Sequence, residues 1–75
     1  MTEVSGADKI SITLNGKPKD VPSNSSVSGL LEMLDLRERL VVVERNGAIL
    51  NRTAFPETLI EPGDVLEIVH FVGGG

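Results

Sequence analysis

Apolar and polar residues alternate strictly near the start of the chain. The apolar positions there are Ile10, Ile12 and Leu14. Strict alternation is typical of a strand that buries one face, so a strand is predicted over 9–14. Asn15-Gly16 follows and predicts a tight hairpin turn, because both central residues of that turn need a positive φ. The returning strand over 17–21 contains Pro18, which cannot donate a ladder hydrogen bond and therefore favours an edge position.

After a short loop, apolar residues recur with the spacing of a helix. They occupy positions i, i+3, i+4 and i+7: Val27, Leu30, Leu31 and Leu34. Such a stripe is the buried face of an amphipathic helix, and Ser26 is expected to cap its first turn. Gly29 weakens this helix by about 1 kcal/mol relative to alanine, so packing must stabilise it. We expect Met33, at helical spacing, to fill the core.

The second half of the chain begins with another strand and hairpin. The apolar run over 40–43 is rich in β-branched residues and predicts a central strand that is buried on both faces. Asn46-Gly47 repeats the hairpin signal, and residues 48–50 form the short returning strand.

Residues 51–61 show no regular pattern, and we expect Phe55 and Leu59 to anchor this segment to the core. Pro62-Gly63 then occupy the positions that these residues favour in a type II turn. A last strand is predicted over 65–72, directly before three terminal glycines.

The order of predicted elements is two strands, one helix, two strands, a loop and a last strand. This order fits an α+β domain in which one helix packs on one face of a mixed sheet of four to five strands. The arrangement and the length match a β-grasp, or ubiquitin-like, fold, with the first and last strands as parallel neighbours at the sheet centre. We expect the domain over 9–72, after a flexible leader over 1–8 and before an extended glycine tail over 73–75.

Composition excludes several classes of function. The 75 residues include no cysteine, which rules out disulfides, thiolate metal sites and thiol nucleophiles. The formal net charge of −4 disfavours binding to nucleic acid, which needs a basic face. No tract is long and apolar enough to span a membrane, and no signal pattern begins the chain, so the expected compartment is the cytoplasm.

Gly73-Gly74-Gly75 is the most unusual feature of the chain. Without Cβ atoms, such a segment passes through a slot too narrow for any side chain, and three extended residues span about 10 Å. One interpretation is that the Gly75 carboxylate is a working group that the tail carries into the active site of another protein. The alternative is a disordered end without function.

The last strand predicts a second surface. Leu66, Ile68 and Val72 alternate with Glu67, Val69 and Phe71. If the even-numbered set faces the helix, the odd-numbered set lies on the open face of the sheet, beside the tail, as a patch for docking partner proteins. With the opposite register, Phe71 belongs to the core.

Other polar residues near this strand give weaker signals. Glu61, Asp64 and Glu67 fit contacts with basic partner residues or a solvated face equally well. His70 is interpreted as a structural or partly exposed residue, because no second catalytic partner accompanies it, and no residue is assigned a catalytic or metal-binding role.

Three segments together resemble the ThiS family of sulfur carriers: residues 40–47, the Pro62-Gly63-Asp64 turn and residues 66–75. The resemblance runs over 9–75, and its C-terminal stretch is its most specific part. The chain departs from the family at Gly29, where family members often have glutamate, and in its longer leader. Loss of that glutamate removes a capping-box partner, which affects stability rather than function.

The resemblance implies a function in thiamine biosynthesis. The Gly75 carboxylate would be adenylylated by a ThiF-type enzyme that uses ATP and Mg²⁺, with Gly73 and Gly74 threading its active site. Sulfur that comes ultimately from a cysteine desulfurase would then give a thiocarboxylate, which a ThiG-type thiazole synthase would use. The chain would be a carrier without bound cofactors, not an enzyme. The alternatives are a MoaD-like small subunit of molybdopterin synthase, a ubiquitin-like protein modifier and an inert interaction domain.

Overall fold

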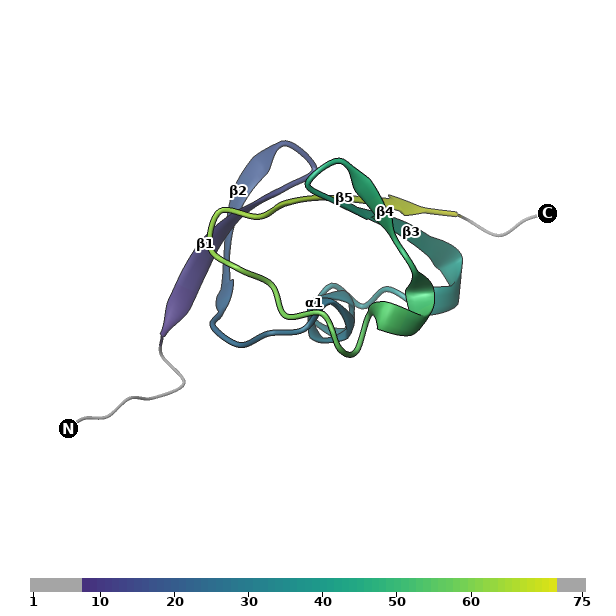
Figure 1. Cartoon of the computed structure of the whole chain (residues 1–75), viewed down its shortest axis with the longest axis horizontal. Coiled ribbons are helices and arrows are strands. Elements are labelled where there is room, and N and C mark those ends of the chain that lie inside the picture. Colours follow the sequence, from purple (N-terminus) through teal and green to yellow (C-terminus); the bar gives the residue numbers. More distant parts are fainter. Residues whose placement is uncertain (1–7, 72–75) are drawn as a thin grey trace.

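A five-stranded mixed sheet arches over one α-helix in the computed structural model, which describes residues 8–71 (Figure 1). The strands are β1 Lys9–Leu14, β2 Lys17–Pro22, β3 Val41–Arg45, β4 Ala48–Leu50 and β5 Val65–His70. The helix is α1 Val27–Met33, and two 3₁₀ turns follow it, η1 Glu38–Leu40 and η2 Arg52–Ala54. The strand order is β2-β1-β5-β3-β4. β1 and β5 are parallel neighbours and the other pairs are antiparallel, which confirms the predicted topology.

The three turns predicted from the sequence all form. Asn15 and Gly16 have φ angles of 51° and 83°, and Asn46 and Gly47 have 54° and 89°, as the predicted hairpin turns require. In the turn before β5, Gly63 has a φ of 83° and the Asp64 N–H donates to the Glu61 carbonyl at 3.1 Å. β2, which contains Pro18, lies at an edge of the sheet as predicted.

The core lies between α1 and the covered face of the sheet. Its buried side chains are Ile12, Val21, Val27, Leu30, Leu31, Val41, Val43, Phe55, Ile60 and Leu66. Ser26 caps α1, because its Oγ accepts a hydrogen bond from the Gly29 N–H at 3.0 Å. The first two helical N–H groups donate to the carbonyls of Thr58 and Phe55, so the loop after η2 completes the cap of the helix.

Two predicted core residues lie at the surface instead. Met33 is 50% exposed, because it lies on the flank of α1 away from the stripe that begins at Val27. Leu59 is 49% exposed, whereas its neighbour Ile60 is 3% exposed. Leu59 pairs with Ser26 in an isolated β-bridge, and adjacent residues of extended backbone point to opposite sides, so Ile60 rather than Leu59 joins Phe55 in the core.

The prediction for 40–43 was wrong in two respects. Leu40 belongs to η1, and β3 begins at Val41. Val41 and Val43 are buried, but Val42 between them is only half-buried, because a helix covers just one face of the sheet. The strand is nevertheless internal, since it pairs with both β4 and β5.

The structure describes the chain from Asp8, whose carbonyl accepts a hydrogen bond from the Ser23 N–H. The rest of the predicted leader, Val72 and the predicted tail over 73–75 lie outside the described residues. Over residues 8–71, no helix has the length and hydrophobicity needed to cross a lipid bilayer.

Candidate functional site

β5 presents alternate residues to the two faces of the sheet. Leu66 is fully buried and Ile68 packs against the core. Glu67 is exposed, and Val69 and Phe71 are 55% and 53% exposed. The predicted orientation of this strand is therefore confirmed, and Phe71 is not a core residue. Val69 and Phe71 are large apolar side chains exposed to water, and in the sequence only Val72 separates Phe71 from the glycines.

The strand register adds residues to this surface that the sequence analysis missed. Val42 lies opposite Val69, and Glu44 lies opposite Glu67 and Ile49. Ile49 is 72% exposed, the largest value among the exposed hydrophobic residues of the described chain. We call this surface the open face; its members are Val42, Glu44, Ile49, Val65, Glu67, Val69 and Phe71. Only the pairing of β3 with β5 brings these residues together, although the Asn46-Gly47 hairpin already set Ile49 opposite Glu44.

Two carboxylates lie side by side on the open face. Along the β3–β5 ladder, every second residue pair is a hydrogen-bonded one. The Asn46 N–H donates to the Val65 carbonyl at one end, and the Phe71 N–H donates to the Leu40 carbonyl at the other. By this alternation Glu44 and Glu67 also form a hydrogen-bonded pair. Cα atoms of such a pair are about 5.5 Å apart. Like charges directly opposite each other are unfavourable, and among residues 8–71 neither carboxylate forms an ion pair. The open face thus combines apolar surface with a compact negative charge.

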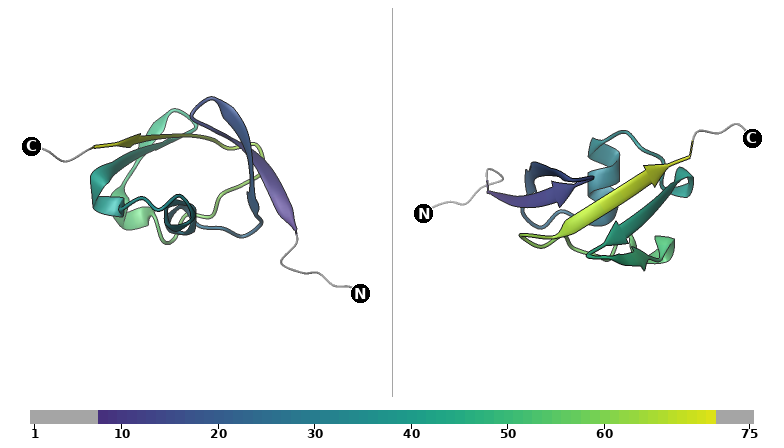
Figure 2. Two further views of the ribbon diagram at one scale, coloured as in Figure 1. Left: turned by 180° about the vertical axis from the view of Figure 1, so that it is seen from behind. Right: turned by 90° about the horizontal axis from the view of Figure 1, so that it is seen from above.

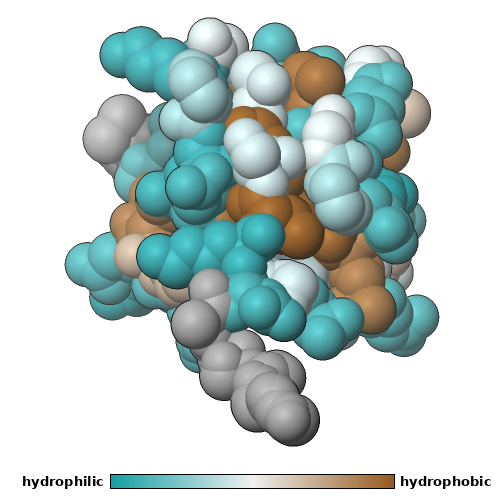
Figure 3. All heavy atoms as spheres, turned by 90° about the vertical axis from the view of Figure 1, so that its left-hand side faces the viewer, coloured by the Kyte–Doolittle hydropathy of each residue, from teal (hydrophilic) through white to brown (hydrophobic). Residues whose placement is uncertain are grey.

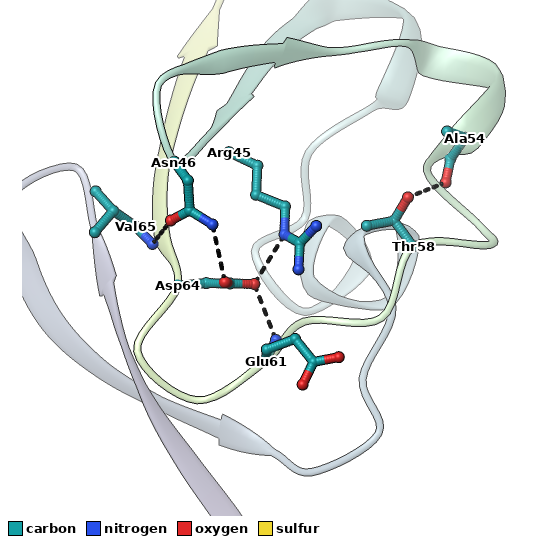
Figure 4. A network of polar contacts seen from close by, with 7 residues as sticks. All are labelled: Arg45, Asn46, Ala54, Thr58, Glu61, Asp64 and Val65. Atoms are coloured by element: carbon teal, nitrogen blue, oxygen red, sulfur yellow. Dashed lines mark hydrogen bonds and ion pairs between the residues drawn. The ribbon is translucent and has the colours of Figure 1, made fainter.

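The start of β5 is fixed by Asp64, which is only 6% exposed (Figure 4). Its carboxylate accepts hydrogen bonds from Arg45 Nε at 2.9 Å, from Asn46 Nδ2 at 3.1 Å and from the Glu61 N–H at 2.9 Å. Asn46 Oδ1 in turn accepts from the Val65 N–H at 2.8 Å. The network joins the β3–β4 turn to the turn that leads into β5.

These contacts lower the pKa of Asp64 from its ordinary value of 3.8. Burial by itself raises the pKa, because it disfavours the charged form. The hydrogen bonds from Glu61, Arg45 and Asn46, together with the positive charge of Arg45, outweigh burial. Asp64 is therefore a structural carboxylate. The suggestion that it contacts a partner or belongs to a solvated face was wrong.

Asp64 and Glu61 also lie at the wrong end of β5 to act with the tail. A strand of six residues is about 20 Å long, and the chain leaves β5 at the opposite end. His70, near that end, is exposed. Within residues 8–71 there is no cluster of side chains suited to binding a metal ion, and no pocket. Gly73, Gly74 and Gly75 lie outside the described residues.

Comparison with known proteins places the chain in a family. The model of the ThiS family matches residues 2–75. This chain belongs to the ThiS family. The sulfur carrier protein ThiS of Bacillus subtilis (strain 168) is 40% identical over 65 residues, which are 85% of this chain and 98% of that protein.

A solved structure supports the fold independently. The crystal structure of the thiamine biosynthesis protein ThiS from Geobacter metallireducens superimposes with a TM-score of 0.75 at 39% identity, covering 88% of this chain and 100% of that one. The β-grasp fold predicted from the sequence is therefore confirmed.

Thiazole synthases also match this chain. The enzyme of Magnetococcus marinus is 38% identical over 64 residues, which are 85% of this chain but 20% of the enzyme. The thiazole synthase of Paramagnetospirillum magneticum, 36% identical, shows the same coverage. The chain thus spans about a fifth of the length of these enzymes, each of which contains a ThiS-like segment within a much longer polypeptide.

Proposed function

We propose that this protein is a sulfur carrier in thiamine biosynthesis and that the carboxylate of Gly75 carries the sulfur. The observation that supports this most strongly is the family match, because it extends through the glycines to Gly75. The similarity to a sulfur carrier from Bacillus subtilis over nearly all of that protein agrees with it. In this role the chain is a co-substrate of cytoplasmic enzymes, and those enzymes supply the catalysis.

The proposed chemistry begins with activation of an unreactive group. A carboxylate resists nucleophiles, because its negative charge repels them and oxide is a poor leaving group. A ThiF-type enzyme with ATP and Mg²⁺ joins the Gly75 carboxylate to AMP and releases pyrophosphate. A cysteine desulfurase supplies the sulfur as a persulfide, and a thiol reductant converts it to sulfide-level sulfur. This sulfur attacks the acyl carbon and expels AMP. The resulting thiocarboxylate keeps sulfur bound to the carrier until thiazole synthase takes it.

The glycines suit this chemistry sterically. Residues 73–75 have no side chains, so the segment fits a channel that admits only backbone. Gly75→Ala is therefore expected to fold normally and to lose sulfur transfer, because its Cβ clashes with the channel wall. Normal thiocarboxylate formation by that variant, measured by intact mass, argues against a narrow channel.

The open face is the proposed docking surface for both enzymes. Val69 and Phe71 are more than half exposed and come shortly before the tail in the sequence, and apolar anchors that become buried at the centre of an interface can carry much of its binding energy. Glu67 and its neighbour Glu44 add a negative charge that suits a basic side chain of the enzyme. The ThiS-like segments inside two thiazole synthases support the synthase as one of the partners, because they place carrier and enzyme in one polypeptide.

The decisive experiment is ATP–pyrophosphate exchange with a ThiF-type enzyme. We expect exchange with the full chain and none after deletion of Gly75. If the full chain supports no pyrophosphate exchange, the proposal is wrong. The intact mass after addition of desulfurase and cysteine then separates related functions. Replacement of one oxygen by sulfur on the free chain identifies a carrier, whereas higher-mass adducts on lysines identify a protein modifier. Complementation of a thiamine-requiring strain, compared with a molybdopterin-deficient one, identifies the pathway.

A further inference from the structure

β5 continues beyond the end of its parallel neighbour β1. The pairing of these strands comprises Thr13 with Val65 and Leu14 with Leu66, and the chain then turns away at Asn15-Gly16. Seen from above, the end of β5 extends past the tip of β1 (Figure 2, right). On its other side, β5 stays paired with β3 as far as His70. The second half of β5 therefore has one open edge.

The hydrogen bonds show which backbone groups point to this edge. The carbonyls of Asp64 and Leu66 accept from the N–H groups of Thr13 and Asn15, both at 2.9 Å. Next along the strand, the Ile68 N–H donates to the side chain of Asn15 at 2.8 Å. Even-numbered residues of β5 thus face β1, and His70 is the next one. By this alternation the Ile68 carbonyl and the N–H and carbonyl of His70 point away from β3. Among residues 8–71, the pairing with β1 ends at Leu66, and no loop or side-chain hydrogen bond reaches these three groups.

The outer edges of the sheet are protected in ways that this edge is not. β2 contains two prolines and two lysines: Lys17, Pro18, Lys19 and Pro22. Residues of these types hinder the addition of a further strand. On the side of the molecule where β1 and β2 lie, hydrophilic residues cover much of the surface, with hydrophobic residues at the centre and at several places along the rim (Figure 3). β4, at the other edge, has only three residues. The end of β5 contains no proline or lysine, and exposed apolar Val69 and Phe71 flank His70.

We propose that the Ile68–His70 edge pairs with an extended segment of the enzyme that activates Gly75, which adds a strand to the sheet of the carrier. The proposal rests on the function proposed above. The edge lies two residues before the tail in the sequence and is continuous with the open face at Val69 and Phe71, so one enzyme surface can contact both. Pairing fixes the register between carrier and enzyme. Four residues lie between His70 and Gly75, so a fully extended chain would span at most about 17 Å from one to the other, and this register limits how far the carboxylate can reach.

A second copy of this chain is a poor occupant of the same edge. The edge offers three backbone groups on two residues, far less contact than a stable dimer needs. Two copies, each with a net charge of −4, also repel each other. An enzyme can supply the missing contact area through the open face, which a symmetric edge pairing leaves uncovered.

Amide hydrogen exchange followed by NMR tests the proposal. In the free chain we expect the His70 N–H to exchange fast and the Phe71 N–H, which is bonded to Leu40, to exchange more slowly. Addition of the ThiF-type enzyme is expected to slow exchange at His70 at least tenfold. Fast exchange at His70 in a complex that still perturbs the signals of Val69 and Phe71 overturns the proposal. Protection at His70 without the enzyme, accompanied by dimers in sedimentation, overturns it in favour of self-pairing.

Two variants separate the backbone of His70 from its side chain. His70→Pro removes the N–H, whereas His70→Ala keeps it and removes the imidazole. We expect the KM for the carrier in pyrophosphate exchange to be about tenfold higher for H70P than for H70A, with kcat unchanged. Equal KM values overturn the proposal. If thermal melting shows that H70P is unfolded, the chain with an N-methylated His70, made by chemical ligation, replaces it. Pyrophosphate exchange with the unmodified chain, measured in the same assay, tests the proposed function separately.

Discussion

Asp64 shows how much one carboxylate contributes to the geometry of the carrier. It accepts hydrogen bonds from the β3–β4 turn and from the turn before β5, and so fixes where the central strand begins. A pattern of hydrophobic and polar residues cannot reveal this, because a buried aspartate and a solvated one look alike in a sequence. Its partners Arg45 and Asn46 lie about twenty residues away, and only the pairing of β3 with β5 brings them close.

Replacement of Asp64 by asparagine is expected to lower the free energy of unfolding by about 1.5–3 kcal/mol, because hydrogen bonds to a charged group are lost. The same contacts make stability depend on pH. The pKa of Asp64 is lower in the folded chain than in the unfolded one, so its contribution is complete above the ordinary value of 3.8. The contribution is lost as the pH falls through the lower, folded-state pKa. Urea unfolding of wild type and D64N, measured from pH 7 to pH 2, should show that the difference between their free energies of unfolding shrinks below about pH 4.

Gly29 provides a second test at the level of single residues. It lies in the first turn of α1, has no positive φ, and a Cβ placed there meets only Ser26 Oγ at 3.4 Å, an ordinary contact. Gly29→Ala is therefore expected to stabilise the domain by about 0.5–1 kcal/mol, through the lower backbone entropy of the unfolded chain. Gly63→Ala is the control, because its φ of 83° makes alanine unfavourable. Thermal melting that shows both variants stabilised contradicts this account.

At the level of elements, turns and caps that depend on adjacent residues were predicted reliably, whereas the burial of single side chains was not, because it depends on distant strand pairing. The two Asn-Gly turns and the Ser26 cap were predicted correctly, because each depends on a few adjacent residues. The exposure of Leu59 depends on a β-bridge with Ser26, 33 positions earlier in the chain. Likewise the open face could be predicted along β5 by alternation, but Val42 and Ile49 joined it only through strand register.

The loop between β4 and β5 is expected to depend on one aromatic anchor. Phe55 is 1% exposed, so Phe55→Ala should cost about 3–5 kcal/mol, a large share of the stability of so small a domain. Leu59→Ala in the same loop should cost less than about 1 kcal/mol, because its side chain is half exposed. Chemical denaturation of both variants measures the contrast. Similar losses for the two would show that Leu59 also packs in the core.

For the whole molecule, the sheet has two unlike faces. Helix α1 covers one of them, and the other presents apolar side chains around the Glu44–Glu67 pair next to the exit of the tail. In the proposed function, this surface stays uncovered by the chain itself, so that each partner enzyme can bind it in turn.

Phe71→Ala tests that surface. We expect it to raise the KM for the carrier in pyrophosphate exchange about tenfold and to change the melting temperature little, since half of the side chain is already exposed. Met33→Ala is a matched control, because Met33 is equally exposed but lies on α1. A large fall in melting temperature for F71A, or an equal rise in KM for M33A, contradicts the assignment of the open face as the docking surface.

The central position of β5 also matters while the protein is being made. β5 is the last of the five strands to be translated, yet both β1 and β3 pair with it. A nascent chain that stops before Val65 therefore has a hairpin on each side and no strand to join them. We expect such incomplete products to remain unfolded and open to proteolysis, because the strand that joins the two hairpins is missing.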